Sequence, residues 1–497
     1  MDEAMTREND GSKSESNTQN QDGSFRVAFL ALGSIGDCLP LCALASTAVA
    51  DGTVNSIVTH EYHISCLQAL MQNTFIAMEP LPRLCPVDIP VLFGGATSSS
   101  NTTATAENYG DGDGDRDEQD ALSTELDACM RVLRDIKPKM LVFNLFSAFG
   151  YHLADALGIP CLCASPGVPP SGGAVPLERI LPWAFLERMD EIDERMGGGK
   201  CGSGASGDEV TRADLELWML PLFHPQYSRW RRARGLLPIV SSSALPRAPP
   251  ILFGVSPAVL PRPGYWPAKA DVCGFWSFPR LSPNYRPPER LARFLSTCAA
   301  EGKPVFVVGL GSMPELGLVK NPERIMGIVV SCLRRAGAAV VLLPTGAAAA
   351  GAAPVEKAVL DLSGEVFVPH KWLLPRCKGI LHHGGAGTTG AALSAGVVQL
   401  VIPLAFDQFF FADQVGYIGV GARVEGTRPR SSGRNSPQSL LAPEGDGVTE
   451  AAIEQALRLV LSEDCNNAAG RYRDLLADED GVETACAKIS AAVNLHR

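Results

Sequence analysis

The stretch ILHHGGAGTTGAALSAGVVQLVIPLAFDQFFFADQ at residues 380–414 decides the fold, because it joins a short apolar run, a glycine-rich turn and a second apolar run. The first run, which ends at Leu381, is typical of a buried parallel strand. The turn HHGGAG then leads into a predicted helix that begins near Thr388. This order of strand, turn and helix predicts one unit of an open parallel sheet.

The glycine-rich turn is suited to an anion such as a diphosphate. Glycines let backbone N–H groups approach a ligand closely, and the first turn of a helix offers unpaired donors and about half a positive charge. The candidate donors are the backbone of Gly385, Ala386 and Gly387, the hydroxyl of Thr388 and the side chain of His383. We therefore predict a phosphate cradle at the carboxyl end of this strand.

The next predicted strand, VVQLVIPL, ends just before Asp407 and Gln408. Both side chains are expected at the same sheet edge as the cradle, and this is the edge where open α/β sheets bind ligands. A carboxylate next to an amide suits the vicinal hydroxyls of a hexose. A hexose site beside a diphosphate site predicts a sugar nucleotide as the ligand.

This stretch resembles the donor-binding signature of the inverting, UDP-sugar-dependent glycosyltransferases of GT-B fold, and most of all the sterol 3-β-glucosyltransferases. Three further stretches resemble that family in the same order: GSIGDCLP at 33–40, VSPAVLPRPGYWPAKADVCGFW at 255–276 and GLGSMP at 309–314. The resemblance implies an α/β architecture of two Rossmann-like, doubly wound domains that face each other across a cleft. It also implies UDP-glucose as the donor substrate and no cofactor.

The resemblance implies roles for residues in both motifs. Asp37 matches the general base that takes the proton from the acceptor hydroxyl. An Asp beside a helix N-terminus can also be a cap, and the residues alone leave both roles open. Ser34, in the same turn, is expected to contact the donor or to align Asp37. His383 matches the histidine that contacts the diphosphate, whereas His382, on the other face of the strand, is expected to be structural.

Three further residues are expected at the nucleotide. Ser312, after the apolar run PVFVVGLG, is expected to offer a hydroxyl to the phosphates, although a turn cap would look the same. His370 and Trp372 are expected near uracil and ribose, with core packing as the alternative for Trp372. The cradle donors would stabilise the charge of the leaving UDP, and this predicts a site without a metal ion.

The chain also departs from the family pattern. Ile35 stands where the family usually has Arg, and Val398 stands where it usually has Pro. The missing Arg could weaken the binding or orientation of the donor. The run FFF at 409–411 stands where the sterol enzymes often have a Pro and a Trp. This run is expected either to pack as the buried face of a helix or to line an acceptor channel.

A length of 497 residues allows two domains of roughly 200 residues each. We expect a disordered tail over 1–24, an acceptor-binding domain over 25–271 and a UDP-sugar-binding domain over 272–460. Flexible insertions are expected at about 94–120, 197–208 and 426–447. The last segment, 461–497, is expected to be helical and to cross back to the first domain.

Composition excludes several other classes of protein. The net charge of −11 and a pI of about 5.3, without a basic run, argue against a nucleic-acid partner. The 14 cysteines are scattered without zinc-ligand spacing and are expected to be free thiols. The polar first 24 residues and the lack of a long apolar stretch predict a cytoplasmic protein. Peripheral membrane contact is a further expectation, with 168–189 as the candidate stretch.

The predicted function is the inverting transfer of a hexose, first of all glucose from UDP-glucose, to the hydroxyl of a lipophilic acceptor such as a sterol. One alternative keeps the chemistry with another lipid, a terpenoid or a polyketide as the acceptor. Another is a nucleotide-sugar- or lipid-binding protein without catalysis, which Ile35 favours. The presence of Asp37, His383, Asp407 and Gln408 together argues against that last alternative.

Overall fold

The computed structural model describes residues 25–47, 53–70, 77–81, 114–144, 147–167, 225–237, 249–262, 269–277, 285–314, 319, 321–343, 358–362, 368–404, 407–424 and 447–496. The expected tail, the insertion at 197–208 and the stretch 168–189 lie outside these ranges, as do residues 94–113 and 425–446. All structural statements below concern the described residues.

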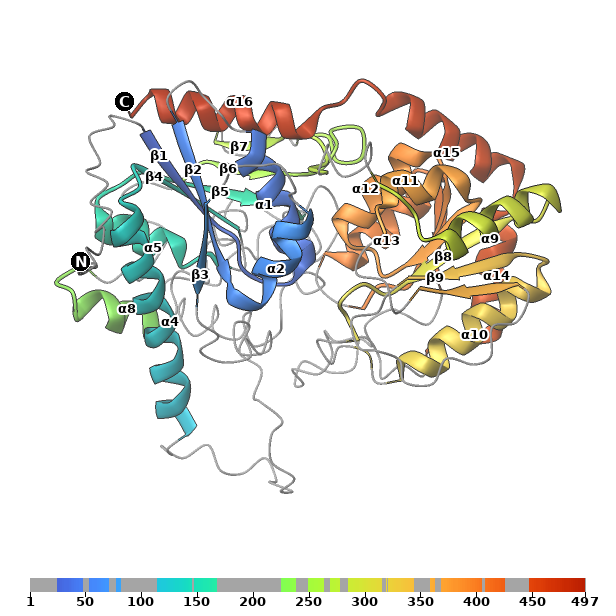
Figure 1. Cartoon of the computed structure of the whole chain (residues 1–497), viewed down its shortest axis with the longest axis horizontal. Helices are drawn as coiled ribbons and strands as arrows, with labels where there is room; N and C mark the ends of the chain where they lie inside the picture. The colour runs from blue at the N-terminus through green and yellow to red at the C-terminus, as the bar shows by residue number, and fades with distance from the viewer. Residues whose placement is uncertain are drawn as a thin grey trace, which may run out of the picture.

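The molecule has two lobes, and each contains one parallel sheet (Figure 1). The strand order is β3-β2-β1-β4-β5-β6-β7 in the first sheet and β10-β9-β8-β11-β12-β13 in the second. In each sheet, the chain first forms a central strand and then adds strands toward one edge. It then returns to the centre and adds the strands of the other half. The order therefore reverses once in each sheet, between β1 and β4 and between β8 and β11. This is the doubly wound, Rossmann-like order that was predicted for both domains.

The first domain has strands β1 Phe25–Leu30, β2 Thr53–His60, β3 Ala77–Leu81, β4 Met140–Phe143, β5 Cys161–Ser165, β6 Ile251–Phe253 and β7 Ala270–Val272. Its helices are α1 Ile35–Thr47, α2 Glu61–Leu70, α4 Gly114–Ile136, α5 Gly150–Leu157 and α8 Pro225–Arg232. The second domain has strands β8 Val305–Gly309, β9 Ala339–Leu342, β10 Val359–Asp361, β11 Gly379–His382, β12 Val398–Val401 and β13 Gly421–Arg423. Its helices are α9 Glu289–Ala300, α10 Pro322–Arg335, α11 His370–Leu373, α12 Ala386–Ala395, α13 Gln408–Tyr417, α14 Glu450–Val460 and α15 Glu463–Leu475, and a 3-10 turn spans Leu374–Arg376. The last helix is α16, Gly481–Asn494.

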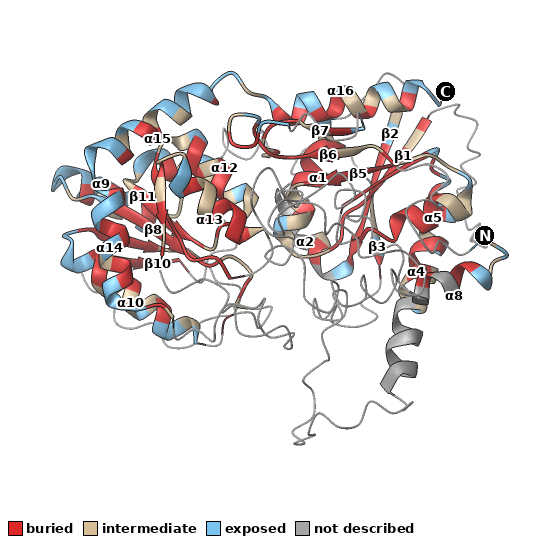
Figure 2. Ribbon diagram, turned by 180° about the vertical axis from the view of Figure 1, so that it is seen from behind, coloured by how far each residue is buried: buried red, intermediate tan, exposed pale blue. Residues whose placement is uncertain are grey.

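Helices cover both faces of each sheet, so the central strands are buried and their sequences are nearly all apolar. In the first domain, α1 and α16 pack on one face, and α4, α5 and α8 pack on the other. In the second domain, α10, α13 and α14 cover one face, and α9, α11 and α12 cover the other. Figure 2 shows buried residues along the strands and exposed residues on the outer sides of the helices.

Helix α4 begins inside the insertion that was expected to be flexible at 94–120. Its first residue is Gly114, so the helix includes residues 114–120 of the expected insertion. The end of the expected insertion is therefore helical.

The C-terminal helices divide between the two domains. Helix α15 packs against α12 of the second domain, whereas α16 lies across the first sheet beside α1 (Figure 1). Five side chains of α16 belong to the first-domain core: Val482, Ala485, Cys486, Ile489 and Val493. Lys488 Nζ also lies 2.9 Å from Asp271 Oδ2, at the end of the first sheet. The crossing back to the first domain therefore follows α15 and is made by α16 alone.

The two passages of the chain between the domains touch each other. Gly274, with a φ of 96°, packs against the backbone of Gly481. Ser256 Oγ donates a hydrogen bond of 2.8 Å to Glu479 Oε1 on the second passage. Past β7 the chain contacts both domains: Trp276 belongs to the first-domain core, whereas a Cβ at Gly390 of α12 would lie 2.5 Å from the Phe275 ring. The first passage therefore runs through these residues, and the boundary expected at 272 stays a prediction.

We expect Gly481→Ala to lower the free energy of unfolding by about 1–3 kcal/mol, as overpacking of a close contact typically does. A Cβ at Gly481 would lie 2.5 Å from the carbonyl oxygen of Gly274 and 2.7 Å from that of Phe275. Urea unfolding of the whole chain measures the change. Gly470→Ala in α15 is the matched control, since a Cβ there meets nothing within 4 Å. Equal free energies of unfolding for the two variants would show that the close contact between Gly481 and Gly274 does not contribute to stability.

Candidate functional site

The predicted site residues follow the strands at the two points where the strand order reverses. In the first domain, Asp37 comes after β1, and the buried Asn144 comes after the neighbouring β4. In the second domain, Ser312 comes after β8, and His383 comes after the neighbouring β11. Open α/β sheets bind ligands at the carboxyl ends of strands at such points. The topology therefore gathers candidate residues at one edge of each sheet.

Asp37 is both a helix cap and a carboxylate with an altered pKa. It is the third residue of α1, and its Oδ2 accepts hydrogen bonds from the Ser34 N–H at 2.8 Å and from the Ser34 hydroxyl at 2.6 Å. A side chain at this helix position that accepts from the N-cap N–H forms half of a capping box. Burial raises the pKa of Asp37 to about 6, against the opposing effect of the Ser34 hydrogen bonds. Capping therefore does not compete with a role as base, because a carboxylate that titrates near neutrality suits proton abstraction.

Two buried polar side chains hold the turn that carries Asp37, and sequence reasoning did not identify either of them. Asn144 Nδ2 donates to the Leu32 carbonyl at 2.7 Å, and His63 Nε2 lies 2.9 Å from the Gly33 carbonyl oxygen. Ser147 Oγ donates to the Asn144 amide oxygen at 2.7 Å and keeps that side chain oriented. For Asn144, the sequence signal was a polar residue directly after the apolar run MLVF, with Ser147 three positions later.

The cradle helix α12 begins at Ala386, two residues before the predicted start at Thr388. Gly385 is its N-cap residue, and the first helical hydrogen bond runs from the Thr389 N–H to the Gly385 carbonyl at 2.9 Å. The Thr389 hydroxyl donates to the same carbonyl at 3.0 Å, which stabilises the first turn earlier than the sequence suggested. The N–H groups of residues 386–388 therefore precede the helical ladder and are the groups that a helix N-terminus offers to an anion.

The two adjacent histidines of the cradle have different environments. His382 is fully buried, its Nε2 lies 3.0 Å from Gln399 Oε1, and its Nδ1 accepts from the Gly384 N–H at 3.1 Å. Burial lowers the pKa of His382 to about 3. Both ring nitrogens are thus used inside the protein, as expected for a structural residue.

His383 has a buried ring nitrogen, Nδ1, without a hydrogen-bond partner among the described residues. Two glycines make room for its ring: a Cβ at Gly311 would lie 2.7 Å from Cε1, and a Cβ at Gly385 would lie 2.6 Å from Nε2. Burial and the neighbouring His370 lower the pKa of His383 to about 4, so the ring is neutral at pH 7. Buried polar atoms are usually paired, so an unpaired one beside a row of N–H donors points to a ligand site.

The start of α13 lies directly against the cradle. Gly384 has a φ of 95°, and a Cβ there would lie 2.9 Å from the Gln408 carbonyl oxygen. The Gln408 side chain is buried, its Oε1 accepts from the Leu404 N–H at 2.9 Å, and its Nε2 lies 3.1 Å from Met313 Sδ. The Gln408 amide therefore closes the loop before α13, a use that the sequence did not predict. Asp407, at the N-cap of α13, is the more exposed of the two side chains.

His370, Trp372 and Ser312 are all half-buried in the second domain. His370 is the first residue of α11, and burial lowers its pKa to about 4. Trp372 packs edge-on against Tyr285, with ring centroids 5.4 Å apart, and the Arg376 guanidinium lies 4.3 Å above its ring. These contacts favour the core-packing alternative for Trp372.

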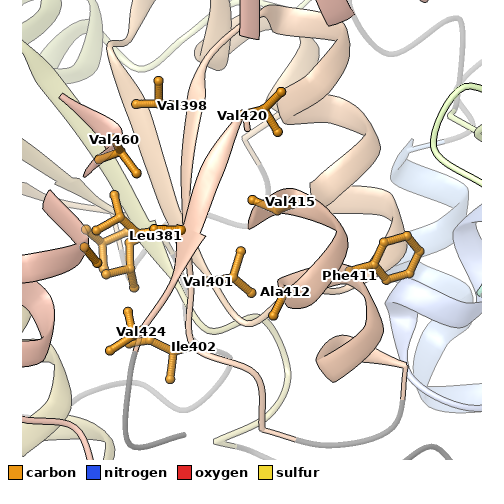
Figure 3. Close-up of a cluster of buried hydrophobic side chains, with 14 of the residues drawn as sticks. Leu381, Val398, Val401, Ile402, Phe411, Ala412, Val415, Val420, Val424 and Val460 are labelled. Atoms are coloured by element: carbon orange, nitrogen blue, oxygen red, sulfur yellow. The ribbon is translucent and has the colours of Figure 1, made fainter. Parts of the chain in front are cut away.

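The departures from the family pattern are accommodated by packing. Ile35 packs against the first-domain core at the start of α1. The side chains of Phe409, Phe410 and Phe411 are 1%, 3% and 0% exposed. Figure 3 shows Phe411 on the side of α13 that faces away from Val401 of β12. The phenylalanine run therefore packs as the buried part of a helix, the first of the two alternatives.

Among the described residues, no group of three His, Cys, Asp or Glu side chains could hold a metal ion. Within the same residues, no helix combines the length and the apolar character that crossing a bilayer requires. Every cysteine whose side chain is described carries a free thiol, and most of them are buried.

Comparison with known proteins adds two sets of relatives. Residues 358–441 match the family model "Erythromycin biosynthesis protein CIII-like, C-terminal domain". Sterol 3-beta-glucosyltransferase of Candida albicans is 27% identical over 410 residues, which cover 81% of this chain and 25% of that protein. The enzyme of the same name from Emericella nidulans is 29% identical over 405 residues, which cover 80% of this chain and 26% of that protein. The chain thus spans about a quarter of the length of the curated relatives it matches.

Solved structures of glycosyltransferases share the fold. The glycotransferase of kitacinnamycin superposes with a TM-score of 0.61 at 16% identity and covers 95% of this chain and 99% of that one. Glycosyltransferase VinC in complex with dTDP gives a TM-score of 0.58 at 16% identity over 94% of this chain and all of VinC. The expected GT-B fold is therefore confirmed, as is the resemblance to sterol 3-beta-glucosyltransferases.

Proposed function

We propose that this protein is an inverting glycosyltransferase that moves a hexose, first of all glucose from UDP-glucose, to the hydroxyl of a lipophilic acceptor such as a sterol. The observation that carries the proposal is the cradle after β11, with its N–H groups at 386–388 and the His383 Nδ1, which has no hydrogen-bond partner among the described residues. The similarity to the fungal sterol 3-beta-glucosyltransferases supports the sterol as first acceptor.

In the proposed reaction, the acceptor hydroxyl gives its proton to Asp37 while its oxygen attacks the anomeric carbon. The bond from that carbon to the UDP oxygen breaks on the opposite face, and UDP leaves with the electron pair. The pKa of about 6 for Asp37 supports this role, because the carboxylate is ionised at pH 7 and still basic enough to take a proton. Ser34 holds the carboxylate in place through its N–H and hydroxyl.

UDP gains negative charge as it leaves. In the proposal, Gly385, Ala386, Gly387, Thr388 and His383 stabilise that charge, because donors positioned in advance need no reorganisation during the reaction. Ser312 adds a hydroxyl from the turn after β8. His370 lies at the uracil and ribose end, with Trp372 beside it on α11. Asp407 binds hexose hydroxyls, and Gln408 supports it by closing the loop before α13.

The test described below distinguishes this function from two alternatives. The same chemistry on another lipid, a terpenoid or a polyketide would leave every second-domain residue in the same role. A binding protein without catalysis is favoured by Ile35, which is half-buried against the first-domain core where the family usually has Arg. The free thiols support a reducing compartment such as the cytoplasm.

The test measures UDP release from UDP-glucose with and without a sterol suspension. We expect release that depends on the sterol and yields a sterol glucoside, which mass spectrometry identifies. Sterol-independent release would instead indicate hydrolysis. Binding of UDP without release, across a panel of sterols, terpenoids and polyketides, would favour the binding protein. A protein that binds neither UDP nor UDP-glucose would contradict the whole proposal.

A further inference from the structure

Gly167 brings the first domain into contact with a predicted sugar-binding residue of the second. It lies just after β5, at the carboxyl edge of the first sheet, and Ser165 Oγ donates to its carbonyl at 3.3 Å. A Cβ built on Gly167 would overlap Asp407 Oδ2 and lie 3.4 Å from Asp407 Cγ. Among the described residues, no other atom outside the residue's chain neighbours lies within 4 Å of that Cβ. The carboxylate of Asp407 therefore occupies the space that a side chain at position 167 would need.

The backbone gives no other reason for a glycine at this position. Gly167 is not among the described glycines with a positive φ, so an alanine would adopt the same backbone without strain. Gly384 and Gly311, by contrast, have φ values of 95° and 60°. Within the part of the chain that the structure describes, the approach of Asp407 is what distinguishes Gly167 from these two glycines.

The contact belongs to a broader junction between α13 and the first domain. Farther along α13, Gln414 Nε2 donates to the Val259 carbonyl at 2.8 Å, and Phe410 and Phe411 share a core with Val255. Through Gln408, the residue after Asp407, the start of the same helix lies against the cradle glycine Gly384. Asp407 thus stands where the cradle, α13 and the first domain meet.

We propose that Gly167 is a positioning residue for the sugar of the donor. Because Gly167 has no side chain, the first domain can close onto Asp407, and this contact keeps the Asp407 carboxylate directed toward the hexose. The UDP moiety is bound by residues of the second domain. This inference rests on the proposed function, because it takes a UDP-sugar as the ligand.

Gly167→Ala is expected to weaken the binding of UDP-glucose by roughly tenfold, a coupling typical of residues in direct contact. The added methyl group must push Asp407 out of position or hold the domains apart. The affinity for UDP should stay within about twofold of wild type, because the cradle lies wholly in the second domain. The measured quantity is therefore the ratio of the two affinities, determined by calorimetry on the full chain.

A double-mutant cycle with Asp407→Ala tests whether Gly167 acts through Asp407. Removing the carboxylate removes the overlap, so Gly167→Ala should have no further effect on UDP-glucose affinity in the Asp407→Ala background. If Gly167→Ala alone does not fold, the same logic predicts that the double variant does. Gly416→Ala on the same helix is the matched control, because a Cβ there meets nothing within 4 Å.

The outcomes separate this inference from the proposed function. Non-additive losses of UDP-glucose affinity with unchanged UDP affinity support it. Additive losses, or an unchanged UDP-glucose affinity in Gly167→Ala, overturn it while leaving the donor site intact. A wild-type protein that does not bind UDP-glucose overturns the proposed function, and the inference with it.

Discussion

Asp37→Asn is expected to lower the rate of sugar transfer by about 10²- to 10⁴-fold while the affinity for UDP stays unchanged. The amide oxygen of asparagine can still accept the two hydrogen bonds from Ser34, so the start of α1 should be preserved. The amide cannot take up the acceptor's proton. Single-turnover transfer from UDP-glucose measures the rate, and calorimetry measures UDP binding.

The pH dependence gives a second readout of the same residue. Burial raises the pKa of Asp37 to about 6, and a general base works only when it is ionised. The rate should therefore fall as the pH drops through about 6, rather than near the usual value for Asp of about 4. The raised pKa also means that the ionised carboxylate costs folding stability above that pH. At pH 7 the Asn variant should unfold at the same temperature as wild type or higher, and a lower temperature together with an unchanged transfer rate would point to a capping role only.

Much of the site could be predicted because its parts are local in sequence. The run GILHH, the glycines and the following helical pattern lie next to each other in the chain, and the strand alternation separates His382 from His383. The strand order follows from the same patterns, because an apolar run that alternates with helices indicates a parallel sheet. These features depend on the periodicity of the chain and on short turns.

The rest depends on contacts between distant segments, which periodicity does not encode. Asn144 supports the turn of Asp37 across 112 residues of sequence, through the carbonyl of Leu32. The contact between Gln408 Nε2 and Met313 Sδ joins two residues that are 95 positions apart in the sequence. The sequence does not distinguish Gly167 from other loop glycines, because its contact with Asp407 is formed only in the folded chain. Helix α12 begins two residues earlier than predicted because the Thr389 hydroxyl donates a hydrogen bond to the Gly385 carbonyl. A glycine-rich sequence does not specify the residue at which the helix starts.

His383→Ala is expected to lower the transfer rate by about 10²- to 10³-fold, the usual effect of removing one donor to a developing negative charge. Because burial lowers the pKa of His383 to about 4, the ring is neutral at pH 7 and would act through a hydrogen bond. The effect should therefore be the same between about pH 6 and 8. UDP affinity should fall as well, and the free energy of unfolding should change little, since Nδ1 has no partner within the described residues.

His382→Ala is the matched control, since it makes the same change one residue earlier in the chain. That variant leaves the Gly384 N–H without its acceptor and Gln399 without its imidazole partner. We expect it to lose about 1–3 kcal/mol of stability for each buried group left unpaired. The His383→Ala variant should thus lose mainly UDP affinity, and the His382→Ala variant should lose mainly folding stability. An unchanged UDP affinity in His383→Ala, with a loss of stability equal to that of His382→Ala, would make both residues structural and move the phosphate site away from this turn.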